Sequence, residues 1–135
     1  MTRQTIIAAN DDPVYLNMIK DVLIEEGYPN VHCITGALSF DFIQQEQPDL
    51  VLLDINITNP AQGWQTLDLL RLHRPTTKIP VIVCSTDGRL LREKADMLYA
   101  MRCETLEKPF DIGVLLEKVQ AIIGPPPERT GEAAR

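Results

Sequence analysis

Short apolar segments alternate with longer amphipathic segments along most of the chain, and this alternation restricts the folds available to it. Each apolar segment has strand length, and apolar residues recur at helical spacing in the segment that follows it. The predicted strands cover residues 5–9, 31–35, 49–54, 80–84 and 103–107. The predicted helices cover residues 13–26, 36–46, 63–73 and 89–100, with a last helix that ends near residue 123. Such serial units predict a parallel sheet with helices on both faces.

Helix signals support these boundaries. Asp12 and Asp111 stand where N-caps are expected, Pro13 suits a first helical turn, and Gly27 suits a helix end. Right-handed connections between five such units favour a doubly wound α/β sandwich with strand order 2-1-3-4-5. We therefore predict a flavodoxin-like (βα)5 fold.

The length of 135 residues favours one domain, which we predict to cover residues 1–123. Residues 124–135, GPPPERTGEAAR, contain three consecutive prolines and no large apolar residue. This composition predicts a Pro-rich flexible tail or the stub of a linker.

Charge and composition argue against several classes of partner. The net charge of −6 does not favour direct binding to nucleic acid or to an anionic membrane. No apolar run is long enough to span a bilayer, and the N-terminus lacks the pattern of a signal peptide. We expect a cytoplasmic protein. Its three cysteines include no CxxC pair, which favours buried free thiols.

Polar residues gather where predicted strands end. Asn10 and Asp11 follow the first strand, Asp54 ends the third, Ser85 follows the fourth and Lys108 follows the fifth. Ligands of open parallel sheets bind at the carboxyl ends of the strands, near the switch in strand order. The predicted order makes strands 1, 3, 4 and 5 neighbours, so we expect these side chains to meet at one edge.

The chemistry of these residues fits phosphoryl transfer. Neighbouring carboxylates such as Asp11 and Asp54 favour Mg²⁺, and the backbone carbonyl of Asn56 offers a third oxygen. A carboxylate can also attack phosphorus and form an aspartyl phosphate. A metal ion and the Lys108 ammonium would stabilise the charge of the transferring group.

Each residue also has an ordinary structural interpretation. Asp54 alone would more often be a turn residue, and Lys108 alone a solvated surface lysine. Ser85 could contribute only to capping the fourth helix, a role that Thr86 or Asp87 could also fill. The order of these residues on successive strands favours the functional interpretation.

The motifs NDDP (10–13), LLDIN (52–56), VIVCST (81–86) and EKPF (107–110), in this order, resemble the CheY-like receiver domain of two-component response regulators. The resemblance covers about residues 4–123. It implies that Asp54 accepts a phosphoryl group from a sensor histidine kinase or a phosphotransfer protein. The domain is then a signalling module of a phosphorelay rather than an enzyme, and its altered surface binds an unknown output protein or domain.

The resemblance also assigns roles within the site. Asp11, Asp54 and the backbone of Asn56 would hold Mg²⁺, with Asn10 as a possible ligand through water. Ser85 would be the switch hydroxyl, and Lys108, followed by a cis peptide bond to Pro109, would contact the phosphoryl group. A homodimer could form through the face made of the fourth helix, fifth strand and fifth helix.

The sequence departs from the family at several positions. Asn10 replaces the first of two adjacent acids, which predicts weaker Mg²⁺ binding. Thr105 stands where many receivers have an aromatic ring, and Met101 and Arg102 replace the usual glycine before the fifth strand. Trp64 either shapes access of phosphodonors or simply packs, and we favour packing.

Two other functions compete with this one. The first is a pseudo-receiver, an interaction module that takes no phosphoryl group, which Asn10 and Thr105 keep open. The second is a haloacid-dehalogenase-type phosphatase, but that chemistry needs a general acid at position 56, where Asn56 cannot serve.

Overall fold

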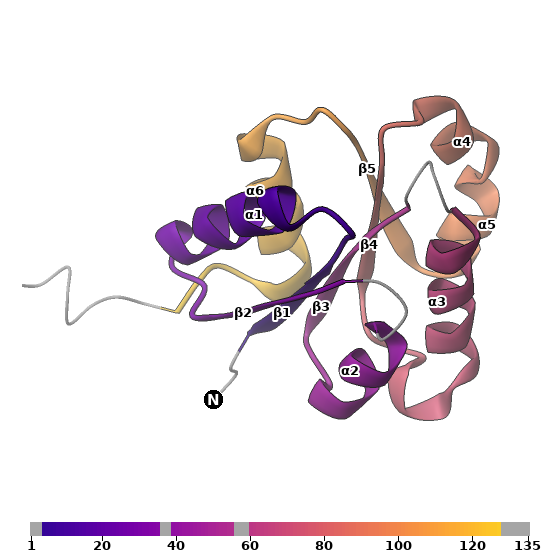
Figure 1. The fold of residues 1–135 in the computed structure, drawn as a ribbon, viewed down its shortest axis with the longest axis horizontal. Helices are drawn as coiled ribbons and strands as arrows, with labels where there is room; N and C mark the ends of the chain where they lie inside the picture. The colour runs from indigo at the N-terminus through magenta and orange to yellow at the C-terminus, as the bar shows by residue number, and fades with distance from the viewer. Residues whose placement is uncertain (1–3, 36–38, 56–59, 128–135) are drawn as a thin grey trace, which may run out of the picture.

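The computed structural model describes residues 4–35, 39–55 and 60–127 of the chain. They form a five-stranded sheet with the order β2-β1-β3-β4-β5, in which every neighbouring pair is parallel (Figure 1). The strands are β1 (Thr5–Ala9), β2 (Asn30–Ile34), β3 (Leu50–Asp54), β4 (Val81–Ser85) and β5 (Cys103–Glu107). The predicted α/β fold and strand order are confirmed.

Helices cover both faces of the sheet (Figure 1). On one face lie α1 (Pro13–Glu26) and α6 (Ile112–Ile123). On the other lie α2 (Ser39–Glu46), α3 (Pro60–Leu72), α4 (Gly88–Glu93) and α5 (Ala95–Ala100). A short 3₁₀ turn, η2 (Arg74–Thr76), connects α3 toward β4.

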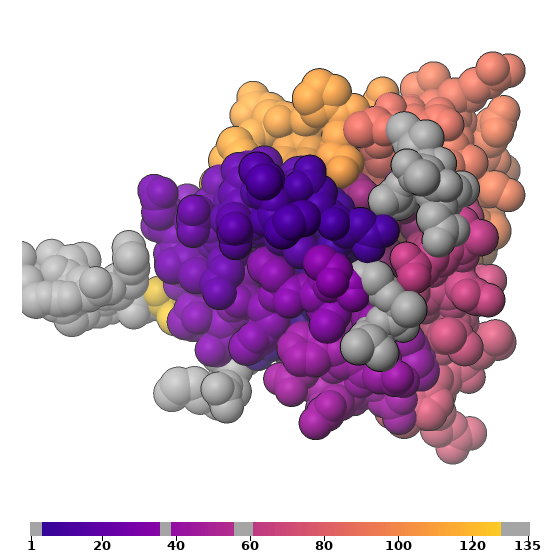
Figure 2. Space-filling model, viewed as in Figure 1, coloured from indigo at the N-terminus to yellow at the C-terminus, as the bar shows by residue number. Residues whose placement is uncertain are grey.

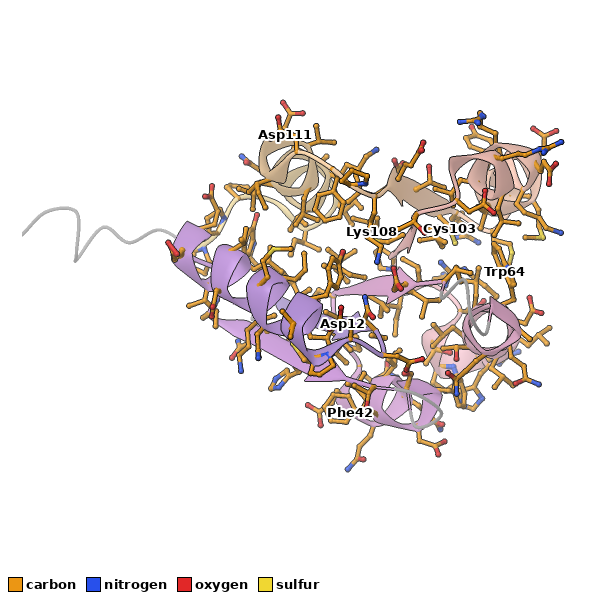
Figure 3. The ribbon with its side chains drawn as sticks, turned by 45° about the horizontal axis from the view of Figure 1, so that its top comes forward. Asp12, Phe42, Trp64, Cys103, Lys108 and Asp111 are labelled. Atoms are coloured by element: carbon orange, nitrogen blue, oxygen red, sulfur yellow. The ribbon has the colours of Figure 1, made fainter. Side chains whose placement is uncertain are left out.

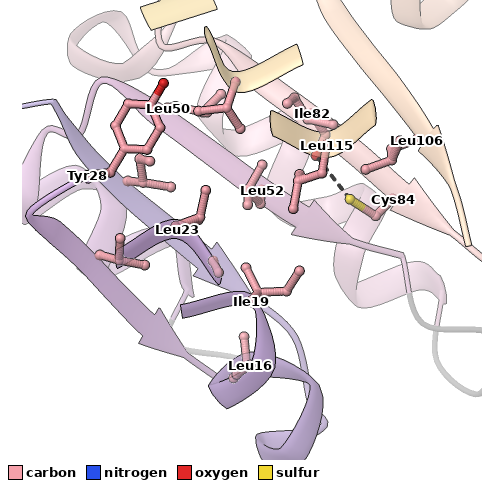
Figure 4. Packing of buried hydrophobic residues seen from close by; sticks show 14 residues of the cluster. Leu16, Ile19, Leu23, Tyr28, Leu50, Leu52, Ile82, Cys84, Leu106 and Leu115 are labelled. Atoms are coloured by element: carbon pink, nitrogen blue, oxygen red, sulfur yellow. Dashed lines mark hydrogen bonds between the residues drawn. The ribbon is translucent and has the colours of Figure 1, made fainter. Parts of the chain in front are cut away.

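Alternate residues of the strands supply two separate cores, because successive strand side chains point to opposite faces. Ile6 and Leu52 pack with Leu16, Ile19 and other residues of α1 and α6 (Figure 4). Their neighbours Ile7, Val51 and Leu53 pack in the second core, under α2 to α5. Burial of each large apolar side chain contributes about 1.5–3 kcal/mol, so both layers of helices are firmly attached to the sheet.

Local signals in the sequence predicted the ends of several elements correctly. The Asp12 carboxylate accepts hydrogen bonds from the backbone N–H groups of Val14 and Tyr15 at the start of α1, and Gly27 ends that helix at φ 121°. Asp111 accepts from Gly113 N at the start of α6. The strands deviate from their predicted bounds by one residue at most.

The predicted helix over residues 89–100 is wrong in one respect, because the structure divides it into α4 and α5. The backbone of Lys94 leaves the helical region at φ −96° and ψ 6°. Leu91 and Leu98, on either side of this break, are both buried in the second core. No glycine or proline stands at the break, so packing rather than local sequence determines it.

The predicted start of α3 at residue 63 is also wrong, since the helix begins at Pro60. Proline suits the first helical position, because its missing N–H would have no partner there. The first residues of the predicted second helix, 36–38, lie outside the described residues.

Residues at the end of α6 form hydrogen bonds with residues from the N-terminal part of the sequence. The Gln4 side-chain amide donates to the carbonyl oxygens of Ile123 at 3.0 Å and Pro125 at 2.7 Å. The hydroxyl of Tyr28, which is 1% exposed, donates to the carbonyl of Gly124 at 2.8 Å. Residues 124 and 125 are therefore held against the domain, whereas residues 128–135 of the predicted tail lie outside the described residues. The boundary at residue 123 stays a prediction.

All three cysteines are free thiols, as predicted, but only Cys84 and Cys103 are buried, whereas Cys33 is partly exposed. Within the described parts of the chain, no helix is both long enough and apolar enough to cross a membrane.

Arg102, just before β5, adopts a left-handed backbone conformation with φ 60°. An L-residue pays about 1–2 kcal/mol for this conformation, whereas glycine adopts it freely. Because glycine also adds entropy to the unfolded chain, we expect Arg102→Gly to raise the free energy of unfolding by a net ~0.5–1 kcal/mol. Urea unfolding measures the change.

Lys20→Gly is the matched control for this prediction, because it removes another exposed cationic side chain from the middle of α1. It is expected to lower the free energy of unfolding by about 1 kcal/mol. A loss of stability in both variants would contradict the assignment of strain to Arg102.

Candidate functional site

Asp54 and Lys108 form a largely buried ion pair where β3 and β5 end. The distance from Lys108 Nζ to Asp54 Oδ1 is 2.5 Å, and the side chains are 16% and 10% exposed, respectively. Asp54 is the last residue of β3, and Lys108 follows β5, where its backbone N–H donates to the carbonyl of Ser85 on β4 at 2.8 Å. The sheet order therefore brings together two residues that are far apart in the sequence. The bond between Lys108 and Pro109 is cis, as predicted.

The charge of Asp54 is unfavourable in this environment despite the lysine. Burial raises the pKa of the carboxyl above its usual value. The hydrogen bond and charge of Lys108 lower the pKa in part, and the nearby charges of Asp11 and Asp12 raise it again. The site thus concentrates negative charge that a further cation would relieve.

The two acids after β1 have different roles in the structure. Asp12 caps α1, the role that the sequence favoured for it. Asp11 is exposed, and its charge acts on Asp54. The charge of Asp12 acts on Asp54 as well, so the assignment of Asp11 as a metal ligand stays a prediction.

Asn10 is buried, with 8% exposure, and uses its side chain to fix the loop before α1. Its carbonyl oxygen accepts a hydrogen bond from Asp12 N at 2.8 Å. Its amide nitrogen is buried and has no hydrogen-bond partner among the described residues. Asn10 also lines a small cavity of about 10 Å³ that Tyr15, Asp54 and Cys84 border, so it shares this cavity with the candidate phosphoacceptor.

Ser85 is fully buried at the end of β4. Its hydroxyl oxygen accepts a hydrogen bond from Asp87 N at 3.0 Å, and Asp87 in turn caps α4 through Leu90 N. These contacts show that Ser85 takes part in the turn that leads into α4, which is the structural interpretation given above. The carbonyl of Ser85 nevertheless accepts from Lys108 N, and Ser85 directly follows Cys84, the residue that pairs with Asp54 in the sheet register.

Asn56, the predicted backbone ligand, lies outside the described residues. Among residues 4–35, 39–55 and 60–127, no three His, Cys, Asp or Glu side chains gather into a metal-binding group. A cation at this site would therefore rely on Asp11, Asp54, carbonyl oxygen and water. Hard oxygen ligands of this kind and the concentrated negative charge fit Mg²⁺, which keeps several waters when it binds.

Tyr15 belongs to the site, although the sequence analysis did not select it. The Lys108 ammonium lies over the Tyr15 ring, 4.1 Å from its centroid. Burial, followed by the charges of Cys84 and Asp54, raises the pKa of the Tyr15 hydroxyl, so the ring stays neutral. The signal in the sequence was an aromatic residue in the first helical turn after an acidic loop, which is weak without the structure.

Trp64 packs against the second core rather than against the ion pair, as we favoured. Figure 3 shows it on the α3 side of the molecule, whereas Lys108 lies more centrally. The adjacent Gly63 allows α3 to approach β3 closely, since a Cβ atom there would lie 2.6 Å from Cδ1 of Ile55. This close approach supports the backbone that directly follows Asp54.

The structure is that of a doubly wound α/β protein. An acidic cluster and a paired lysine lie at the carboxyl edge of its parallel sheet. Sequence comparison identifies the family within this class. The family described as the response regulator receiver domain matches residues 6–120. The chain therefore belongs to the response regulator receiver family, with CheY-like structural neighbours, as the motifs indicated.

Individual relatives are distant. The chain is 27% identical over 118 residues to the transcriptional regulator RpaA of Synechocystis, covering 87% of this chain and 48% of that protein. It is 26% identical over 121 residues to PilH of Pseudomonas aeruginosa, covering 87% and 96%. The chain thus spans about half the length of RpaA and nearly all of PilH.

Solved structures agree on the fold. Chemotaxis protein CheY4 of Vibrio cholerae is 21% identical with a TM-score of 0.72, over 89% of this chain and 99% of that chain. The receiver domain of a sensor histidine kinase from Pseudomonas aeruginosa, with a magnesium ion coordinated in its active-site cleft, is 19% identical with a TM-score of 0.66. That comparison covers 90% of this chain and 98% of the other.

Proposed function

We propose that this receiver domain accepts a phosphoryl group on Asp54 from a histidine kinase or a phosphotransfer protein and thereby changes its partner-binding surface. The observation that supports this most is the buried contact between Asp54 and Lys108. A buried carboxylate with a raised pKa is costly to maintain. A lysine held against it is the arrangement that phosphoryl transfer requires.

The chemistry follows from the contacts. Lys108 engages Oδ1 of Asp54, which leaves the other carboxylate oxygen as the candidate nucleophile. That oxygen forms a bond to phosphorus while the bond from phosphorus to the donor nitrogen breaks, and the electron pair of that bond stays with the donor imidazole. The Lys108 ammonium neutralises negative charge on the phosphoryl oxygens.

We assign Mg²⁺ to the same site, held by Asp11, Asp54 and the backbone carbonyl of Asn56. When bound, the ion supplies positive charge opposite the phosphoryl oxygens. The magnesium in the cleft of the related histidine kinase receiver supports this assignment. Asn10, where the family usually has an acid, leaves less negative charge for the ion, and we retain it as a possible ligand through water.

Phosphorylation would be read at the surface rather than by further chemistry, so we regard the protein as a signalling module and not as an enzyme. The Ser85 hydroxyl oxygen accepts from Asp87 N, and its own O–H could at the same time donate to a phosphoryl oxygen on Asp54. The reading partner is another protein or domain, or a second copy docked on the face formed by α4, α5, β5 and α6. We retain as predictions a cytoplasmic location and the assignment of residues 124–135 to a flexible tail or a linker stub.

The proposal is tested by incubating the protein with acetyl phosphate and Mg²⁺ and measuring its intact mass. We expect a gain of one phosphoryl group that requires Mg²⁺, disappears in Asp54→Asn and persists in Asp68→Asn, which changes an exposed carboxylate of α3. No gain in the folded wild-type protein would favour the pseudo-receiver. Steady turnover of a generic phosphomonoester would favour the phosphatase.

A further inference from the structure

Two side chains that follow β5 contact the Tyr15 ring. The Lys108 ammonium lies over its face, 4.1 Å from the centroid. The Phe110 ring meets it edge to face, with centroids 6.5 Å apart and an interplanar angle of 79°. These contacts join the start of α1 to the segment before α6, and Figure 2 shows the two segments side by side on the near surface.

A ring in this place has a definite physical effect on the lysine. A Lys side chain is flexible and carries its charge at the end of a four-carbon stem. The negative face of an aromatic ring attracts an ammonium group, and the attraction is stronger where water is excluded. The Lys108 side chain is 16% exposed, so little water screens its attraction to the ring.

We propose that Tyr15 is a positioning residue for phosphoryl transfer, because its ring face holds the Lys108 ammonium beside Asp54. This inference rests on the proposed function of Asp54 and adds a residue that none of the four motifs covers. Thr105 provides no aromatic ring from β5. The ring that contacts the lysine instead comes from α1, and Phe110 keeps that ring in its orientation.

The contact itself is tested without phosphoryl transfer. A ring face shifts the NMR signals of the Lys108 side-chain methylenes upfield. We expect this shift to persist in Tyr15→Phe and to disappear in Tyr15→Leu. It should be unchanged in Tyr99→Leu, which removes a ring that is 85% exposed on α5. An unchanged shift in Tyr15→Leu would overturn the inference.

The effect on reactivity is tested with acetyl phosphate at saturating Mg²⁺. From the usual strength of such contacts, Tyr15→Leu is expected to lower the maximal phosphorylation rate by about 3- to 30-fold, whereas Tyr15→Phe keeps most of it. In a Lys108→Met background, Tyr15→Leu should cause no further loss. Tyr15→Met, which has no ring but fills a similar volume, replaces Tyr15→Leu if that variant unfolds.

The outcomes separate this inference from the proposed function. Equal losses in Tyr15→Phe and Tyr15→Leu, or the same loss with and without Lys108, would show a merely structural role and overturn the inference alone. A wild-type protein that takes no phosphoryl group would overturn the proposed function, and the positioning role would fall with it.

Discussion

Lys108→Met is expected to lower the free energy of unfolding at pH 7 by about 2–4 kcal/mol, because it leaves a buried carboxylate without its cation. Asp54 is 10% exposed and lies 2.5 Å from the Lys108 nitrogen. Burial already raises the pKa of Asp54, and Lys108 lowers it in part. Loss of the lysine therefore raises that pKa further. Urea unfolding of wild type and variant measures the difference.

The loss should also depend on pH. A carboxyl group whose pKa is higher in the folded than in the unfolded protein destabilises the fold progressively as the pH rises between the two values. Below both values Asp54 is protonated in the folded and unfolded states, and the missing cation costs little. The difference between Lys108→Met and wild type should therefore shrink as the pH falls toward about 4.

Lys118→Met provides the control for this prediction. Lys118 pairs with Glu104 at 3.4 Å, but the two side chains are 31% and 57% exposed. Surface pairs contribute about 1 kcal/mol at most, so this variant should lose little stability. Equal losses in the two variants at pH 7, or a loss in Lys108→Met that does not change with pH, would contradict the electrostatic interpretation of the site.

Asn10→Asp is expected to tighten Mg²⁺ binding about tenfold, since it adds a negative charge to the cavity that Asn10 shares with Asp54. Without Mg²⁺ the same charge should lower the free energy of unfolding by about 1–2 kcal/mol, because position 10 is 8% exposed. The new carboxylate can still accept the hydrogen bond from Asp12 N. Calorimetric titration with Mg²⁺ and urea unfolding with and without the ion measure both effects.

Asn17→Asp makes the same chemical change on the exposed surface of α1 and should leave Mg²⁺ affinity unchanged. An Asn10→Asp variant with the Mg²⁺ affinity of the wild type would contradict the placement of Asn10 beside the cation. Equal tightening in both variants would show a general effect of net charge.

The fold was predictable because local signals and packing agree over most of the chain. The apolar strands lie in the buried sheet, Asp12 and Asp111 cap the starts of their helices, and Gly27 ends α1, as their residue types indicate. The start of α3 was predicted three residues too late, although Pro60 suits a first helical position. The division between α4 and α5 was not predictable, because no helix-ending residue type marks Lys94. Its backbone leaves the helical conformation only in its tertiary context.

The site was predictable to the extent that sheet topology determines it. Strand order brings Asp54 and Lys108 into contact, and this could be inferred from their positions at strand ends. The direction of a single side chain could not be inferred. The Ser85 hydroxyl oxygen accepts from Asp87 N, and the Tyr15 ring on α1 contacts the Lys108 ammonium after β5. Both contacts depend on rotamers and on packing between distant segments.

The proposal that Asp54 accepts the phosphoryl group is tested most directly by identifying the carboxylate that carries it. After incubation with acetyl phosphate and Mg²⁺, borohydride reduces an aspartyl phosphate to homoserine, and peptide mass spectrometry locates the changed residue. We expect homoserine at position 54 and nowhere else. Conversion of Asp11 or Asp12 instead, or no conversion in the folded protein, would contradict the proposal.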